Sequence, residues 1–148
     1  MASAMIQGLE SLEHRPAIAV CDPDERARQK HTLLGRPTCR DITDLTKVDI
    51  AVLAFKPQHF AGAVPALRQA LDKGALVVSI MVGISCSTIE DSLDSVRVVR
   101  VMPNTPMAIG LGMSGVAPGN RATESDVEIA AAICAPSSEV LRVSESQI

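Results

Sequence analysis

The sequence has almost no aromatic side chains: its 148 residues include two Phe and neither Trp nor Tyr. A surface that stacks the bases of single-stranded nucleic acid therefore has almost nothing to be built from. The 14 basic side chains are outnumbered by 17 acidic ones, and the formal charge of −3 also disfavours nucleic acid as a partner. Since 47% of the chain is hydrophobic, we expect one folded domain with an aliphatic core.

Metal-binding spacing is also lacking. The cysteines form no CxxC pair and have no histidine near enough to complete a zinc site, so we expect small buried or half-buried thiols. The histidines are too dispersed to predict a metal site or a histidine-based triad. These residues are Cys21, Cys39, Cys86 and Cys134, and His14, His31 and His59.

Long apolar runs are absent as well. No stretch approaches the roughly 20 residues of a membrane span. The first residues lack the basic-then-apolar order of a signal peptide. We therefore expect no membrane partner and a cytoplasmic location.

Helical and strand patterns alternate along the chain. Apolar residues in 2–12 recur at helical spacing, whereas 17–21 is a short apolar run typical of a buried strand. Further helices are expected over 23–34, 60–71, 87–93 and 123–134, with a short one near 41–44, and further strands over 48–54, 75–81, 96–102, 113–117 and 139–143. The two arginines in 96–102 predict a strand that is less buried or nearer an edge.

Strands joined by helices in this rhythm predict an α/β fold of Rossmann-like type, with a mostly parallel sheet and helices on both faces. Ligands of such folds bind beyond the carboxyl ends of the strands. The loops after 21, 54, 81 and 102 are therefore the candidates for a site.

The first of these loops is acidic, with Asp22 and Asp24 flanking a proline and with Arg26 and Arg28 close behind. In a dinucleotide fold, an acidic residue after the second strand accepts hydrogen bonds from the adenosine ribose, while arginine favours a 2′-phosphate. The alternative is that both carboxylates cap the next helix and the arginines are solvated.

The second loop is residues 54–57. Pro57 disfavours helical geometry at Lys56, so the chain leaves the strand extended and its backbone can face a ligand. The lysine could contact a phosphate or carboxylate, or it could be an ordinary exposed side chain.

The third and fourth loops carry Gly83 and the segment 100–106. A missing Cβ at Gly83 would allow a flat ligand to approach, although a simple turn glycine has the same sequence. Two prolines bracket Asn104 and Thr105, which could bind a nicotinamide or a substrate, or could satisfy a rigid turn.

Three segments together carry a family resemblance: AFKPQ at 54–58, SIMVGIS at 79–85 and VRVMPNTPMAIGLGMSGV at 99–116. In this order and spacing they resemble pyrroline-5-carboxylate reductase. That family makes L-proline by hydride transfer from NADPH or NADH to the C=N carbon of 1-pyrroline-5-carboxylate. It combines an N-terminal Rossmann domain with a helical C-terminal dimerisation domain.

The resemblance implies a set of cofactor-binding residues. The family's Ala-Val-Lys-Pro cofactor loop is matched with Phe in place of Val, at Ala54, Phe55, Lys56 and Pro57. Val82 and Gly83 match part of its Ala-Ala-Gly loop, and Asn104 lies in the matching Met-Pro-Asn-Thr-Pro loop. Asp41 falls near a family asparagine that contacts the dinucleotide. Asp22 stands where NADPH-preferring members have a small polar residue, which favours NADH or use of both.

Both ends of the chain fall inside the family's protein. The family begins with a strand and a Gly-x-Gly-x-Met-Ala turn, and Met1 corresponds to a position within that turn. Its helical domain follows beyond Ile148. We therefore expect residues 1–148 to form a partial NAD(P)-binding domain that lacks the first strand, leaves two inner strand edges unpaired, and is inactive or nearly so.

The implied function is an oxidoreductase of proline biosynthesis that uses NADPH or NADH, with 1-pyrroline-5-carboxylate as the small-molecule partner and a homo-oligomer as the intact enzyme. Two alternatives stay open: another Rossmann oxidoreductase such as a beta-hydroxyacid dehydrogenase, and a noncatalytic remnant that binds a partner through its open sheet edge. No catalytic residue can be named.

Overall fold

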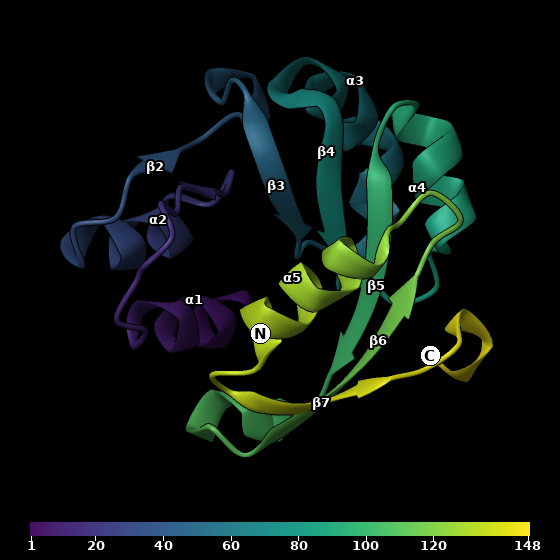
Figure 1. Ribbon diagram of the computed structural model, residues 1–148. Coiled ribbons are helices and arrows are strands. Elements are labelled where there is room, and N and C mark those ends of the chain that lie inside the picture. Colours follow the sequence, from purple (N-terminus) through teal and green to yellow (C-terminus); the bar gives the residue numbers. More distant parts are fainter.

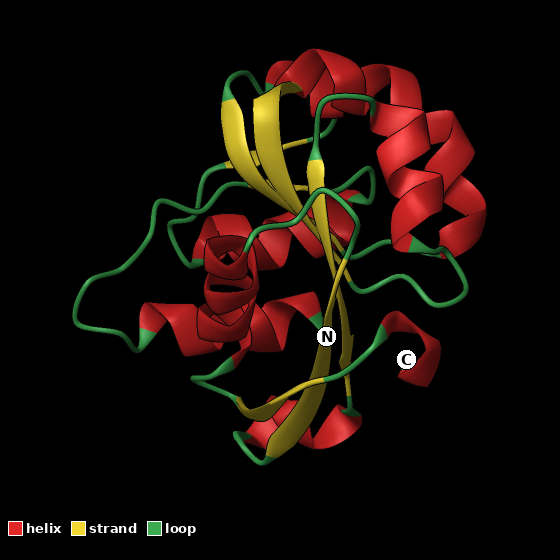
Figure 2. Cartoon of the chain, turned by 45° about the vertical axis from the view of Figure 1, so that its right-hand side comes forward, coloured by secondary structure: helices red, strands yellow, loops and turns green.

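The computed structural model describes residues 1–148, which fold into helices on both sides of a sheet (Figures 1 and 2). The helices are α1 Ala2–Glu10, α2 Glu25–Leu33, α3 Phe60–Ala70, α4 Cys86–Leu93 and α5 Glu124–Cys134. The strands are β1 Val20–Cys21, β2 Thr38–Cys39, β3 Val48–Leu53, β4 Leu71–Ser79, β5 Arg97–Pro103, β6 Gly112–Pro118 and β7 Ser138–Arg142. Single 3-10 turns lie at η1 Ile42–Asp44, η2 Pro57–His59, η3 Thr105–Ile109 and η4 Glu145–Gln147.

The strands form two separate sheets. The larger has the order β3-β4-β5-β6-β7, and all its neighbours are parallel except the antiparallel pair β5 and β6. The smaller consists of β1 and β2, which are parallel. In Figure 1, α2 and β2 lie to the left of β3, apart from the larger sheet. The predicted Rossmann-like class with a mostly parallel sheet is confirmed, and the edges of β1 and β3 are unpaired with each other.

Two apolar layers hold the larger sheet. On one face, α1 and α5 pack against Leu76 and Val78 of β4, and on the other face α3 and α4 pack against Val77. This alternation follows from the two-residue period of a strand. Burial on both faces explains why β4 reads as an almost continuous apolar run. All three of these side chains are at most 1% exposed.

The arginines of β5 do not mark an edge, so that prediction is wrong. The strand lies between β4 and β6, and Arg100 is only 7% exposed. Each arginine reaches a carboxylate outside the strand: Arg100 approaches Glu145 at 3.5 Å, and Arg97 approaches the buried Asp126 at 3.5 Å. Long arginine side chains can thus be accommodated in a central strand when acidic partners meet them.

Residues 9–52 contain no buried residue, which corrects the expectation of buried strands at 17–21 and 48–54. The ordered part of the first is only two residues long, and Ile50 and Val52 of β3 are 43% and 38% exposed. The reason is that β1 and β3 each have one unpaired edge. An ion pair between Arg36 and Glu10 at 2.5 Å links this part of the chain to α1.

Helix ends follow local capping chemistry. Thr123 and Asp126 form a capping box at the start of α5, where the sequence predicts a helix from residue 123. Helix α4 begins one residue before the expected 87, because Ser85 caps it by accepting a hydrogen bond from the Thr88 amide at 3.1 Å. Strand β4 begins at Leu71, earlier than the expected start at residue 75, because α3 ends at Ala70. The strand passes through Gly74, which has a left-handed backbone conformation.

We expect Gly112→Ala to lower the free energy of unfolding by about 1–3 kcal/mol. An added Cβ would lie 2.8 Å from the Met107 Cα, so strand or turn must shift. Urea unfolding of the variant measures the change. Gly62→Ala in α3 is the matched control, because a Cβ there meets no atom within 4 Å, and it should stabilise by about 0.5–1 kcal/mol. Equal effects at the two sites would contradict the packing described here.

Candidate functional site

A cavity of about 1170 Å³ opens between the two sheets. Apolar residues from both sides line it, including Ile18 and Val20 at β1 and Ile50 and Val52 on β3. The volume slightly exceeds the range of about 300–1,000 Å³ that is usual for small-molecule sites. It contains the carboxyl ends of β1 and β3, where ligands of open α/β sheets bind.

Five of the nine predicted cofactor residues line this cavity: Asp22, Asp41, Ala54, Phe55 and Lys56. They come from three different loops, which the topology brings together. The other four, Pro57, Val82, Gly83 and Asn104, are not among its lining residues. The last three follow β4 and β5, so the candidate site as a whole extends along the carboxyl ends of β1 to β5.

The loop that contains Asp22 leads directly into helix α2. The Asp22 carboxylate accepts a hydrogen bond from the Asp24 backbone amide at 2.8 Å, and the Asp24 carboxylate caps α2 by accepting from the Arg26 backbone amide at 2.9 Å. Arg28 donates to the Asp22 carbonyl at 2.6 Å. The capping interpretation is therefore confirmed for Asp24 and wrong for Asp22, whose carboxylate orders the loop before the helix. Arg28 stabilises the same loop rather than standing free in solvent.

Asp41 begins the turn η1 and is exposed. Its amide donates to the Asp44 carboxylate at 3.4 Å, so the short helix expected near 41–44 is present as a single 3-10 turn. Asp41 also lines the cavity.

The segment 54–57 leaves β3 as its proline predicts. Lys56 has extended backbone angles, φ −69° and ψ 139°, and Pro57 opens the turn η2. Phe55 is half-buried against the α3 and α4 layer, whereas Ala54 and Lys56 are exposed. The backbone of this loop therefore faces the cavity while one side chain anchors it to the core.

The loop after β4 is open to solvent. Val82 is 65% exposed, and Gly83 has φ +78° with no atom within 4 Å of the position of a Cβ. The positive φ alone accounts for glycine at this turn. The same open space leaves room above the loop for a ligand.

Asn104 ties its own loop together. The side-chain Oδ1 of Asn104 accepts a hydrogen bond from the Met113 backbone N–H at 2.9 Å, and the Asn104 backbone N–H donates to the Met113 carbonyl at 3.2 Å. The interpretation of a rigid, self-satisfied turn is confirmed for the side-chain oxygen. The Asn104 side-chain amide nitrogen makes no hydrogen bond within the chain and remains able to donate to a ligand.

Sequence reasoning missed the basic and backbone donors of the cavity. Ala2 and Ser3, in the first turn of α1, line it, as do Lys30 and Arg40. A helix N-terminus carries partial positive charge and suits an anion, and α1 has no acidic residue in its first turn. The sequence placed a helix here, but only the fold shows that its first turn faces the strand ends.

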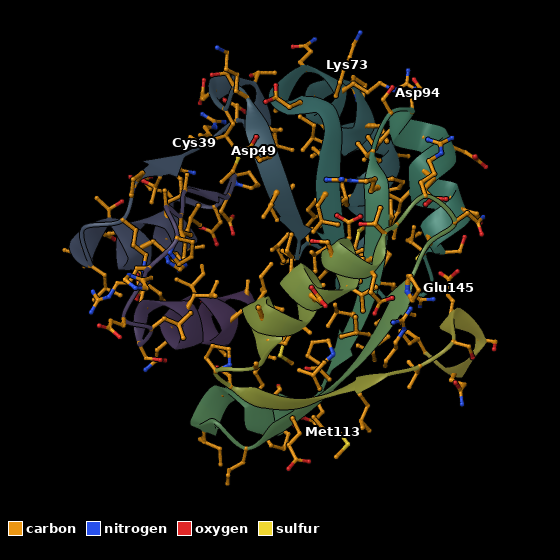
Figure 3. All side chains as sticks on the ribbon, viewed as in Figure 1. Cys39, Asp49, Lys73, Asp94, Met113 and Glu145 are labelled. Carbon is orange, nitrogen blue, oxygen red and sulfur yellow. The ribbon has the colours of Figure 1, made fainter.

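A second missed feature fixes the start of α4. Glu145 Oε1 accepts a hydrogen bond from the Cys86 amide at 2.6 Å and lies 3.5 Å from a guanidinium nitrogen of the buried Arg100. Figure 3 shows Glu145 at the turn that follows β7. Burial, followed by the nearby Glu145 carboxylate, raises the pKa of the Cys86 thiol to about 12. The start of α4, just after the Val82 loop, is thus held by a residue 59 positions further along the chain.

Comparison with known proteins places the chain in a family. Residues 1–83 match the model of the family described as NADP oxidoreductase coenzyme F420-dependent. The chain belongs to this family. No helix in the structure is long and apolar enough to cross a membrane.

Curated proteins similar to this chain include pyrroline-5-carboxylate reductases. This similarity confirms the resemblance that the three sequence motifs predicted. The chain is 45% identical over 98 residues to the reductase of Vibrio alginolyticus, covering 65% of this chain and 36% of the relative. It is 30% identical over 157 residues to pyrroline-5-carboxylate reductase 1 of Bacillus subtilis, covering 100% of this chain and 52% of the relative.

The fold comparison agrees. The structure of a pyrroline-5-carboxylate reductase from Coxiella burnetii superposes with a TM-score of 0.90 at 28% identity. The match covers 99% of this chain and 56% of that one. The chain therefore spans between about a third and just over half of the length of these relatives.

The buried thiol of Cys86 predicts a loss of stability in alkali. Its folded pKa is raised from 9.0 to about 12, so the folded state holds more protons than the unfolded state between these values, and stability falls as pH rises through them. We expect Cys86→Ser to make this fall shallower in urea titrations from about pH 8 to 11. Ser87→Ala should leave the slope unchanged, and an equal slope for Cys86→Ser would contradict the assignment.

Proposed function

We propose that residues 1–148 act as the NAD(P)-binding domain of a pyrroline-5-carboxylate reductase, which reduces 1-pyrroline-5-carboxylate to L-proline. The observation that carries the proposal is that the motif residues after β1, β2 and β3 meet at one cavity. The similarity to reductases of this name over the whole chain supports the substrate. The reaction adds a hydride to the imine carbon and a proton to the imine nitrogen.

The lining residues fit a dinucleotide. Asp22 would accept hydrogen bonds from the adenosine ribose, and the first turn of α1 would bind the pyrophosphate, with Lys30 and Arg40 adding positive charge. The exposed backbone from Ala54 to Lys56 would lie along the cofactor. When bound, the reduced nicotinamide supplies the hydride.

The loops after β4 and β5 would bind the nicotinamide end of the dinucleotide. Val82 and Gly83 present open backbone there, and Asn104 offers a free side-chain amide for the nicotinamide or the substrate. Pro57 holds Lys56 in extended geometry. None of these groups is assigned the role of proton donor.

We also propose that the intact enzyme is a homo-oligomer located in the cytoplasm. Exposed apolar side chains in and beside η3, β6 and β7 support association, because an interface would bury them. They are Ile109, Leu111, Met113 and Leu141, which are 75%, 73%, 46% and 51% exposed. Four free cysteines suit a reducing compartment.

The proposal is tested by titrating the chain with NADH and NADPH and following nicotinamide fluorescence. A second version carries an apolar strand and a glycine turn joined ahead of Met1. We expect tighter binding by this version, because an added strand can pair with the open edges of β1 and β3. Failure of both versions to bind either nucleotide would overturn the proposal, and proline-dependent dye reduction by the full-length enzyme tests the substrate.

Asp22 should determine the choice between the two nucleotides. Its carboxylate would repel a 2′-phosphate, so Asp22→Ser should raise the affinity for NADPH relative to NADH roughly tenfold, or about 1.4 kcal/mol. Asp49→Asn is the control, since Asp49 is exposed on β3 and does not line the cavity. An unchanged ratio in Asp22→Ser would contradict the ribose assignment.

A further inference from the structure

Two cysteines lie side by side in the smaller sheet. Cys21 of β1 and Cys39 of β2 are register partners in the parallel pair, so their side chains leave the same face of the sheet. Neighbouring strands are about 4.8 Å apart, which falls within the Cα separation of about 4.4–6.8 Å found in disulfides. Figure 3 marks Cys39 on β2.

Both thiols are free and half-buried, whereas Cys86 and Cys134 are buried in the larger part of the fold. The Cys21 thiol donates to the Arg40 carbonyl at 3.7 Å. Burial raises the pKa of Cys21 to about 12, with further contributions from Cys39 and from the carboxylates of Asp41 and Asp44. The Cys21 thiol is therefore protonated at neutral pH, and both cysteines are exposed enough for a disulfide reagent to reach them.

The segment between the two cysteines has little else to hold it. It consists of β1, α2 and β2, and none of its residues is buried. Its main contacts are the two-residue strand pair, the packing of α2 on both strands, and the Arg36–Glu10 ion pair. Units without an apolar core are the ones that gain most from a covalent cross-link.

We propose that Cys21 and Cys39 form a reversible disulfide that closes this unit when the chain meets an oxidised disulfide such as glutathione disulfide. The thiolate of one cysteine attacks the reagent and releases one glutathione, and the second cysteine then displaces the other. Two protons and two electrons leave the pair, and two reduced glutathiones are formed. The inference is independent of the cofactor assignment.

The reduced chain is treated with glutathione disulfide, unfolded in excess alkylating reagent, digested and mapped by mass spectrometry. We expect a peptide pair joining Cys21 to Cys39, with Cys86 and Cys134 alkylated. Dithiothreitol should abolish the link. Because the thiolate is the reacting form, the link should form faster at about pH 9 than at about pH 7.

Variants separate the two steps. In Cys39→Ser, Cys21 should retain glutathione as a mixed disulfide, because no second thiol displaces it. Cys134→Ser is the matched control and should leave the link unchanged. In the wild-type chain, the link should also slow tryptic cleavage of the segment between β1 and β2, because this segment contains several basic residues at which trypsin can cut.

Three results would overturn the proposal. Glutathione could remain singly on each cysteine without a link, or the link could join two copies through Cys21 and show as a dimer on a non-reducing gel. A link that leaves cleavage between β1 and β2 unchanged would overturn its stabilising role. Each outcome is measured without added nucleotide, so failure here leaves the proposed function untouched.

Discussion

The structure depends on the burial of β4 and β5 between two helical layers. Alternate residues of β4 face α1 and α5 on one side and α3 and α4 on the other, and Val77, Val78, Val98 and Val99 are fully buried. Full burial of one such side chain contributes about 1.5–3 kcal/mol. Because both strands are fixed on both faces, their carboxyl ends hold the loops at Val82 and Asn104 in constant positions. The carboxylates that meet Arg97 and Arg100 allow charged side chains in this central strand.

The other half of the candidate site has no comparable support. Residues 9–52 contain no buried residue, and β1 and β3 face the cavity with open edges. Asp22 and Asp41 therefore stand on loops that are held by hydrogen bonds and one ion pair, across the cavity from residues of β3 and α3. Regions with few buried apolar contacts open at low free energy. A ligand that bridges both halves would supply contacts that the chain does not make by itself.

Much of the fold was predictable, because it is encoded locally. The capping box of Thr123 and Asp126 and the extended Lys56 before Pro57 each depend on neighbours within a few residues. The burial of Arg100 could not be predicted from the sequence, since its partner Glu145 lies 45 positions away. The exposure of Ile50 and Val52 was also missed, because an apolar alternation cannot show that one strand edge is unpaired. For the candidate site, the sequence predicted Asp22 and residues 54–56, which the structure places at the cavity, whereas the position of α1 beside them required the packed structure.

Amide hydrogen exchange with and without NADH tests the central claim most directly, namely that one dinucleotide site joins a rigid sheet to a weakly held unit. Without nucleotide, amides of residues 20–45 should exchange much faster than those of β4 and β5. Saturating NADH should slow exchange at Asp22, Ile42 and Lys56, while β6 and β7 stay unchanged. Exchange that NADH and NADPH both leave unaltered throughout the chain would contradict the claim.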